Sequence, residues 1–293
     1  MDGIINVYKE AGFTSHDVVA KLRGILHMKK IGHTGTLDPD ATGVLPVALG
    51  KGTKLVDLLT DKEKTYEAVL HLGIDTDTQD MSGTVLEERP VNVTEEEVRK
   101  VLKSFVGEQL QVPPMYSALK VNGKKLYELA REGKTVERKA RPVCFYEIEP
   151  LEFHLPLVKI RVTCSKGTYI RTLCHDIGEK LGCGGCMEEL LRSRVGRYSL
   201  FESHTLAQVE AAVADGTVQD MIDPVEAVLA EYPALYADSY GDRLLANGNP
   251  LSDNLVRPQH KEGWVRMYAS DGTFTGIFQW DAGKKKYYPV KMF

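Results

Sequence analysis

The chain has 293 residues, of which 43% are hydrophobic and 27% charged, and a formal net charge of −4. A chain of this length forms one large domain or two unequal ones and can fold without disulfide or metal crosslinks. Its composition excludes disordered, collagen-like and coiled-coil proteins. No apolar run is long enough for a membrane span, and the N-terminus lacks the pattern of a secretion signal. Five cysteines, an odd number, then indicate free thiols in the cytoplasm.

Charge is unevenly distributed along the sequence. The segment 113–143 has eight Lys or Arg residues and three Glu, and the segment 159–199 has eight Lys or Arg residues and four acidic ones. The segments 75–97 and 200–240 are strongly acidic. Such segregation is typical of a protein that presents one basic face to a polyanion, although solvated helix faces explain it equally well.

Hydrophobic periodicity predicts alternating strands and helices over residues 1–235. The predicted strands span 4–7, 66–73 and 158–164, and the predicted helices span 18–26, 94–105, 173–181 and 205–213. Thr14 or Ser15 can cap the first helix, and Thr94 with Glu97 forms a capping box for the second. Gly182 ends the third.

The segment 32–52 does not follow this pattern. Its five glycines and two prolines are too many for a regular helix, so we expect a long loop with at most one helical turn. Loops of this length in compact domains are usually functional. The loop contains Asp38 followed by Pro39, and a proline restricts the residue before it, so the carboxylate is held in a fixed geometry. An ordinary Asp-Pro turn is the alternative interpretation.

The end of the chain reads as a separate β-rich unit. Helical patterning stops within 232–241, and a hairpin follows with strands at 264–269 and 274–280 around a turn at 270–272. A last strand is expected near 287–290. We therefore predict two domains, residues 1–235 and residues 236–293.

Other motifs carry little chemistry by themselves. Cys183 and Cys186 form one CxxC pair, without the second pair or the histidines that a zinc site needs. P-loop, GxGxxG and GxSxG motifs are absent from the sequence, so nucleotide-dependent and α/β-hydrolase chemistry are not indicated. Tyr169 and Arg171 are two residues apart and can face the same side of an extended segment, but this pairing is common and usually structural.

Several long stretches together resemble the TruB family of tRNA pseudouridine synthases. The stretches that carry the resemblance are KEAGFTSHDVV, GHTGTLDPDATGVLPVALGKGTK, KTYEAVLHLGIDTDTQDMSG, PPMYSALKVNGKKLYELAREG and SKGTYIRTLCHDIGEKLG, in family order. GNPLS and the hairpin VRMYASDGTFTGIFQW resemble a small RNA-binding PUA-type domain. Glu10 departs from the family, which usually has proline there, and we expect a more flexible first turn.

The resemblance implies a mixed α/β (α+β) fold of the pseudouridine synthase type, with a central, largely antiparallel sheet flanked by helices, and a PUA-like module behind it. It implies that uridine-55 in the T-arm loop of tRNA is flipped out and isomerised to pseudouridine, without a cofactor or metal. The basic segment 120–142 resembles an insertion that closes over the RNA stem-loop, where phosphate contacts dominate affinity. A cytoplasmic monomer with no obligatory protein partner and no membrane association is also implied.

The resemblance also implies catalytic roles for three residues. Asp38 matches the catalytic aspartate. It could attack the ribose carbon, remove a ribose proton to assist departure of uracil, or attack C6 of the base, and these routes stay open. Arg171 matches the arginine that pairs with this carboxylate, and a guanidinium there would favour and orient the ionised form. Tyr66 matches an aromatic position against the target base and is a candidate for moving the C5 proton.

Five further positions match substrate contacts of the family. Tyr169 encloses the base with Tyr66, His33 holds the extruded nucleotide, Leu190 forms an apolar wall, and Lys54 and Arg192 contact phosphates. Without the resemblance, Lys54 and Arg192 read as ordinary surface charge.

Other functions remain as alternatives. A non-catalytic RNA-binding protein or tRNA chaperone on the same scaffold would not need Asp38, Arg171 and Tyr66 together. A guide-RNA-dependent relative that modifies ribosomal RNA usually carries a fuller RNA-binding tail. A hydrolase with a His33–Asp38 dyad would leave the basic insertion unexplained.

Overall fold

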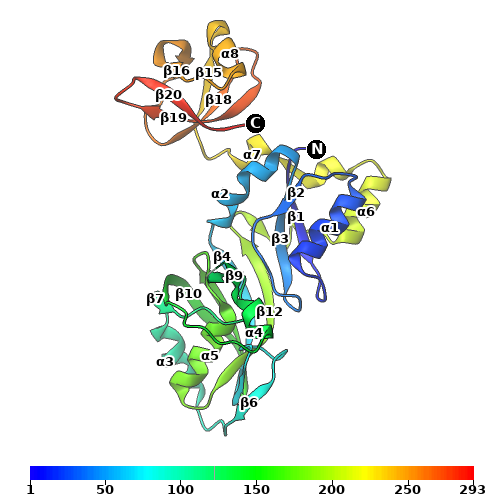
Figure 1. Ribbon diagram of the computed structural model, residues 1–293, viewed down its shortest axis with the longest axis vertical. Coiled ribbons are helices and arrows are strands. Elements are labelled where there is room, and N and C mark those ends of the chain that lie inside the picture. Colours follow the sequence, from blue (N-terminus) through cyan, green and yellow to red (C-terminus); the bar gives the residue numbers. More distant parts are fainter. Residues whose placement is uncertain (122) are drawn as a thin grey trace.

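A computed structural model describes residues 1–121 and 123–293; Asn122, in the predicted RNA-closing segment, lies outside the described residues. The first part of the chain is built on a ten-stranded sheet with helices on both of its halves (Figure 1). Its central path runs in the order β14-β1-β3-β12-β4-β11-β10-β7, with β2 beside β3 and β13 beside β12. No helix of the described residues is long and apolar enough to cross a membrane.

Neighbouring strands of this sheet are antiparallel except for the short β3–β12 contact, which confirms the predicted largely antiparallel sheet. The strands are β1 (Gly3–Lys9), β2 (Ile31–His33), β3 (Thr42–Leu49), β4 (Lys64–Leu72), β7 (Gly107–Gln111), β10 (Arg141–His154), β11 (Leu157–Cys164), β12 (Gly185–Val195), β13 (Tyr198–Ser199) and β14 (Ile222–Pro224). Two hairpins pair separately: β5 (Ile74–Thr76) with β6 (Val85–Glu88), and β8 (Lys120–Val121) with β9 (Lys124–Lys125).

The helices divide between the two halves of the sheet. In Figure 1, α1 and α6 lie together beside β1 and β3, whereas α3 and α5 lie on the half that contains β10. The helical segments are α1 (Ser15–Ile25), η1 (Gly50–Leu55), α2 (Val56–Thr60), α3 (Glu95–Ser104), α4 (Leu126–Arg131), α5 (Ile170–Leu181), α6 (Leu206–Ala214), η2 (Val218–Met221) and α7 (Val225–Val228). Thr14, Thr94 and Thr205 cap their helices through side-chain hydrogen bonds, and Gly182 ends α5 in the left-handed conformation, as the sequence predicts.

The predicted loop at 32–52 is only partly a loop. Residues Thr42–Leu49 form β3, a strand next to β1 and β12 in the interior of the sheet. The run VLPVAL is buried along its whole length, so it shows the continuous apolar pattern of an interior strand rather than alternation. The glycines Gly43 and Gly50 lie at its two ends and do not interrupt it. The loop proper is the shorter segment 34–41 between β2 and β3.

Gly43 joins the two halves of the sheet. It is the β3 partner of Arg192 in β12 and has a φ of +108°, and a Cβ there would lie 2.3 Å from the Arg192 carbonyl oxygen. Only glycine fits this close approach. The loop that carries Asp38 therefore enters β3 at the point where β3 pairs with β12.

The β-rich C-terminal unit is a six-stranded sheet at the end of the molecule opposite α3 and α5 (Figure 1). It contains β15 (Ala234–Ala237), α8 (Ser239–Ala246), β16 (Leu251–Ser252), η3 (Asp253–Leu255), β17 (Val256–Arg257), β18 (Trp264–Tyr268), β19 (Phe274–Asp281) and β20 (Lys286–Met292). The predicted hairpin and last strand correspond to β18, β19 and β20. Because β15 begins at Ala234, this sheet starts inside the predicted 1–235 range. Ile277 and Phe293 pack against a cluster that includes Leu55 and Tyr198, which joins the two units.

Candidate active site

The loop 34–41 holds Asp38 in place through contacts on both sides of it. The Leu37 N–H donates to the Ser15 hydroxyl at 2.8 Å, and the Leu37 side chain is buried in the large core beneath. Lys9, fully buried, donates to the Pro39 carbonyl at 2.9 Å, and so does the Gly12 N–H at 3.0 Å. Burial lowers the pKa of Lys9 to about 8, and the nearby Asp38 and Asp40 oppose this shift. Glu10, in the place of the usual proline, leaves the Lys9 contact to the loop intact.

Arg171 links Asp38 to a second carboxylate, that of Asp80. Its Nη2 forms an ion pair with Asp38 Oδ2, and its Nη1 lies 3.1 Å from Asp80 Oδ2 and 3.4 Å from the Thr78 carbonyl oxygen. The Arg171 side chain is only 8% exposed. A buried guanidinium with a carboxylate on each side has its orientation fixed by both. Arg171 lies in the first turn of α5 and not, as predicted, in an extended segment.

The two carboxylates have different surroundings. Asp80 Oδ1 accepts from the Thr78 hydroxyl at 2.7 Å and from the Ser82 hydroxyl and N–H at 2.6 and 3.1 Å. Asp38, by contrast, is 39% exposed against 14% for Asp80. Asp80 is therefore the structural anchor of Arg171, and Asp38 is the carboxylate that can reach a substrate. Asp80 is not among the residues that the sequence predicts for the site, although it lies in the acidic loop of one of the matching stretches.

The Asp80 loop is itself fixed to the two elements that surround it. The Gln79 side-chain oxygen accepts from the Thr172 hydroxyl of α5 at 2.7 Å, and the Gln79 carbonyl accepts from the Met187 N–H of β12 at 3.0 Å. Asp80 therefore moves with α5, and the distance between the two carboxylates is set by the fold.

Tyr66 lies on β4 with its side chain in the same apolar cluster as Leu37, and Leu190 packs against that cluster. It is 7% exposed, and burial raises the pKa of Tyr66 to about 12, with Arg192 opposing the shift. Tyr169 is half-buried at the N-terminal end of α5 and burial raises its pKa as well. The structure thus brings Asp38, Arg171 and Tyr169 together at the N-terminal end of α5, whereas Tyr66 belongs to the apolar cluster against which Leu190 packs.

Removal of the Tyr66 hydroxyl tests whether it moves a proton. Because a phenol with a pKa near 12 stays protonated from pH 6 to 9, we expect its contribution to the rate to be constant over that range. Tyr66→Phe should slow product formation by about 10²-fold or more if the hydroxyl transfers a proton. Tyr198→Phe, another buried tyrosine outside this cluster, is the control. Equal rates for Tyr66→Phe and the parent from pH 6 to 9 would exclude the proton-transfer role.

Arg192 does not lie where a phosphate contact requires. It is 1% exposed, and its guanidinium donates to the carbonyls of Val44 at 2.7 Å and of Thr36 and Gly35 at 3.4 Å each. A guanidinium that is buried and hydrogen-bonded to the loop is not accessible to a backbone phosphate. The structure makes Arg192 a support of the Asp38 loop. His33 on β2 lies nearby, and burial lowers its pKa, with Arg192 acting in the same direction.

Lys54, in contrast, is exposed, and its ammonium donates to the Met292 carbonyl at 2.6 Å. The salt dependence of RNA binding separates the two cations, because each phosphate contact adds about one to its logarithmic slope. We expect Lys54→Met to reduce that slope by about one and Arg192→Lys to leave it unchanged while slowing the reaction. If Arg192→Lys instead reduced the salt slope and left the reaction rate unchanged, Arg192 would contact a phosphate and would not support the Asp38 loop.

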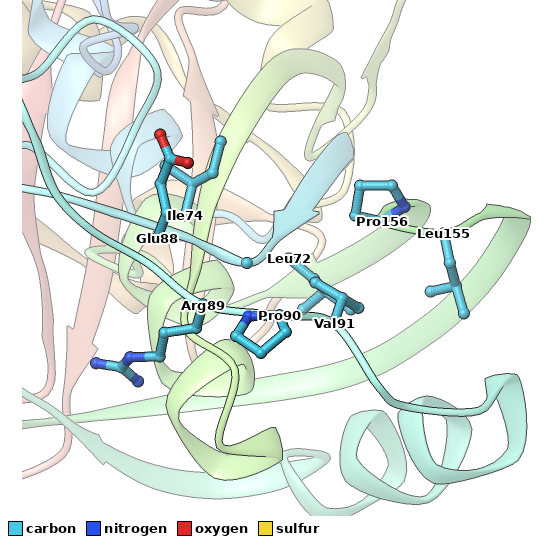
Figure 2. Close-up of a pocket in the computed structure, with 9 residues that line it drawn as sticks. Leu72, Ile74, Glu88, Arg89, Pro90, Val91, Leu155 and Pro156 are labelled. Atoms are coloured by element: carbon cyan, nitrogen blue, oxygen red, sulfur yellow. The ribbon is translucent and has the colours of Figure 1, made fainter.

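One open concavity lies away from these residues. It has a volume of about 520 Å³, and Figure 2 shows that its lining comes from the end of β4, the segment 88–91 and the turn at Leu155 and Pro156. Leu72 in its wall is six residues from Tyr66 along β4, or about 20 Å. None of the residues that line this concavity is Asp38, Arg171, Tyr66, Tyr169 or Leu190.

Among the residues that the structure describes, no group of three or more His, Cys, Asp or Glu side chains is arranged to hold a metal ion. All five cysteines are free thiols, Cys183 and Cys186 included.

Comparison with known proteins assigns the family. Residues 23–170 match the model of the TruB family pseudouridylate synthase N-terminal domain, and residues 171–230 match that of the tRNA pseudouridylate synthase B C-terminal domain. The chain belongs to the TruB family of pseudouridine synthases. It is 53% identical to tRNA pseudouridine synthase B of Lachnoclostridium phytofermentans over the full length of both chains. It is 48% identical to that of Clostridium novyi over 94% of this chain and 95% of the relative.

Solved structures agree with this assignment. A chain of a Cbf5-Nop10-Gar1 complex superposes with a TM-score of 0.75 at 29% identity, covering 99% of this chain and 84% of that one. A chain of an H/ACA RNP bound to a substrate RNA gives a TM-score of 0.73 at 28% identity, with the same coverage. The predicted pseudouridine synthase fold with a PUA-like C-terminal module is thus confirmed. As a TruB-family protein, the chain is an isomerase that forms pseudouridine in tRNA.

Proposed function

We propose that this TruB-family chain isomerises uridine-55 in the T-arm loop of tRNA, with Asp38 as its catalytic carboxylate. The observation that carries the proposal is the different exposure of the two carboxylates on Arg171: Asp80 is enclosed by hydrogen bonds, whereas Asp38 is accessible. An ionised, oriented and accessible carboxylate is the group that this cofactor-free reaction needs.

The isomerisation exchanges one bond for another and leaves the composition of the nucleotide unchanged. The bond from N1 of uracil to C1′ of ribose breaks, the base rotates, C5 forms the new bond to C1′, C5 loses its proton and N1 gains one. Asp38 can assist as a nucleophile at C1′, as a base that takes a ribose proton, or as a nucleophile at C6. Each route needs a carboxylate and none needs a redox group or a metal.

The other site residues shape the space around the flipped base. Tyr66 and Leu190 provide an apolar wall in the same cluster, and Tyr169 lies at the start of α5. Flipping a base out of its stack costs a few kcal/mol of stacking and pairing free energy, and aromatic and apolar contacts with the protein offset this cost. His33 holds the extruded nucleotide. Lys54 and the basic segment 120–142 contact the phosphates of the stem.

Independent action on tRNA fits better than a guide-RNA-dependent role. The solved structures named as RNP or multi-protein complexes are 28–29% identical to this chain, whereas the relatives named tRNA pseudouridine synthase B reach 53% over the full length. We therefore propose a monomer that acts in the cytoplasm without a protein partner.

An unmodified tRNA transcript tests the substrate and the position together. The transcript, a U55C transcript and the isolated T-arm stem-loop are incubated with the purified chain, and pseudouridine is located by carbodiimide mapping. Modification at position 55 of the transcript and the stem-loop, and at no position of U55C, supports the proposal. Binding of all three RNAs without product would favour a non-catalytic RNA-binding protein. Product at another position would correct the site.

A further inference from the structure

Gln111, the last residue of β7, holds the backbone of Tyr169 through both ends of its side-chain amide. Its Oε1 accepts from the Tyr169 N–H at 2.8 Å, and its Nε2 donates to the Tyr169 carbonyl at 3.0 Å. The two residues are 58 positions apart in the chain, and Gln111 is 4% exposed. A buried amide with both groups satisfied by one backbone unit fixes that unit in position and orientation.

The backbone unit that Gln111 holds is the N-cap of α5. Tyr169 itself provides no side-chain cap to this helix, although Thr14, Thr94 and Thr205 cap other helices with their own hydroxyls. The Tyr169 carbonyl also accepts the first hydrogen bond of α5, from the Leu173 N–H at 3.1 Å. Gln111 therefore sets the position of the helix end that carries both the Tyr169 ring and Arg171.

Gln111 also lies at the base of the basic segment. The chain leaves the sheet directly after Gln111 and returns at Arg141, its ladder partner in β10. The Tyr169 hydroxyl lies near Ser117, six residues after Gln111, and near Arg141, where the chain returns to the sheet. A displacement of the segment 112–141 can thus reach Tyr169 through Gln111, which is covalently joined to the segment and hydrogen-bonded to the Tyr169 backbone.

We propose that Gln111 is a positioning residue that couples the segment 112–141, when it contacts RNA, to the placement of Tyr169 and Arg171 against the flipped base. This inference rests on the proposed function. It assigns Gln111 no contact with the substrate: Gln111 acts through Tyr169 and the first turn of α5. Its loss should therefore affect the reaction step more than RNA binding.

Three variants separate positioning from general packing. Gln111→Met has a similar length and removes both hydrogen bonds, whereas Gln111→Glu keeps the acceptor for the Tyr169 N–H and loses the donor. Gln109→Met is the matched control, because Gln109 lies on the same strand and donates to the carbonyls of Ser104 and Phe105 near the end of α3. Single-turnover rates at saturating tRNA, the Kd for tRNA and thermal unfolding are measured for each.

We expect Gln111→Met to reduce the single-turnover rate at least about 10-fold, since small misplacements of reacting groups have effects of this size. Its Kd should stay within about 3-fold of the parent value. Gln111→Glu should show a smaller reduction of the single-turnover rate than Gln111→Met, and Gln109→Met should have the rate of the parent. A Gln111→Met rate within about 3-fold of the parent, an effect on Kd alone, or an equal loss in Gln109→Met would overturn the inference.

If Gln111→Met does not fold, the single-turnover rate of Gln111→Glu is compared with that of the parent. A Gln111→Glu rate equal to the parental rate then overturns the inference. A parent that forms no pseudouridine under these conditions refutes the proposed function instead.

Discussion

Replacement of Asp38 by Asn is expected to reduce the rate of pseudouridine formation by at least about 10³-fold, the scale on which removal of a nucleophile or its base acts in other enzymes. The amide has the size of the carboxylate but no charge, so it can neither attack C1′ or C6 effectively nor take a ribose proton. All three open routes therefore predict the same loss. Single-turnover formation of pseudouridine in a tRNA transcript measures it.

The neighbouring carboxylate provides the control for Asp38. Asp40 is two residues away on the same loop and exposed, and Asp40→Asn makes the same chemical change. We expect this variant to keep a rate within about 3-fold of the parent. Equal losses in the two variants would mean that the loop needs negative charge in general and that Asp38 has no special role.

Replacement of Arg171 by Met should affect both activity and stability. The guanidinium is 8% exposed, and its removal leaves the 14%-exposed Asp80 without its cation. Removing one partner from a buried ion pair costs about 3 kcal/mol of unfolding free energy or more. Because Asp38 also loses the group that orients it, we expect the single-turnover rate to fall by about 10²- to 10³-fold. Urea unfolding and single-turnover assays measure the two effects.

Arg161 offers a matched comparison for Arg171. It also contacts two carboxylates, with Nη2 3.0 Å from Glu67 and Nη1 3.1 Å from Glu149, but its side chain is 42% exposed. Water screens an exposed pair, so Arg161→Met should cost less than about 1 kcal/mol and leave the rate unchanged. If Arg161→Met destabilises the protein as much as Arg171→Met does, burial is not what gives the Arg171 pairs their strength.

The sequence predicts the helices and strands that are marked by neighbouring residues, such as helix caps, hydrophobic periodicity and hairpin turns. The capping boxes of α1, α3 and α6, the periodicity of α5 with its terminal Gly182, and the β18–β19 hairpin are such signals. The sequence predicts a loop in place of β3 because the glycines at the ends of this strand are indistinguishable in the sequence from those of the true loop. β12 was not predicted, since its charged residues hide an interior strand. Arg192 can be buried there only because it meets carbonyls of residues 35, 36 and 44, which the sequence does not place near it.

The candidate site also contains some residues that the sequence predicts and others that depend on long-range contacts. Asp38, Arg171 and Tyr66 lie in stretches that resemble the family, and the structure places Asp38 in contact with Arg171 and Tyr66 in the adjoining apolar cluster. Asp80 lies in a matching stretch and Gln111 lies two residues before the next one, but their importance comes from contacts with α5 and its N-cap across 91 and 58 residues of chain. Such contacts depend on the completed sheet and leave no periodic signal. For Arg192 the resemblance implies a phosphate contact, and the residues alone predict surface charge, because a basic residue is usually exposed; neither signal predicts its burial.

The most direct test of the central claim separates binding from chemistry at Asp38. The parent and Asp38→Asn proteins are each mixed with an unmodified tRNA transcript, the complexes are isolated, and the nucleosides of the bound RNA are analysed. The account predicts that both proteins retain tRNA with similar Kd values, and that pseudouridine appears only in the RNA bound to the parent. Pseudouridine formed by Asp38→Asn at the parental rate would contradict it.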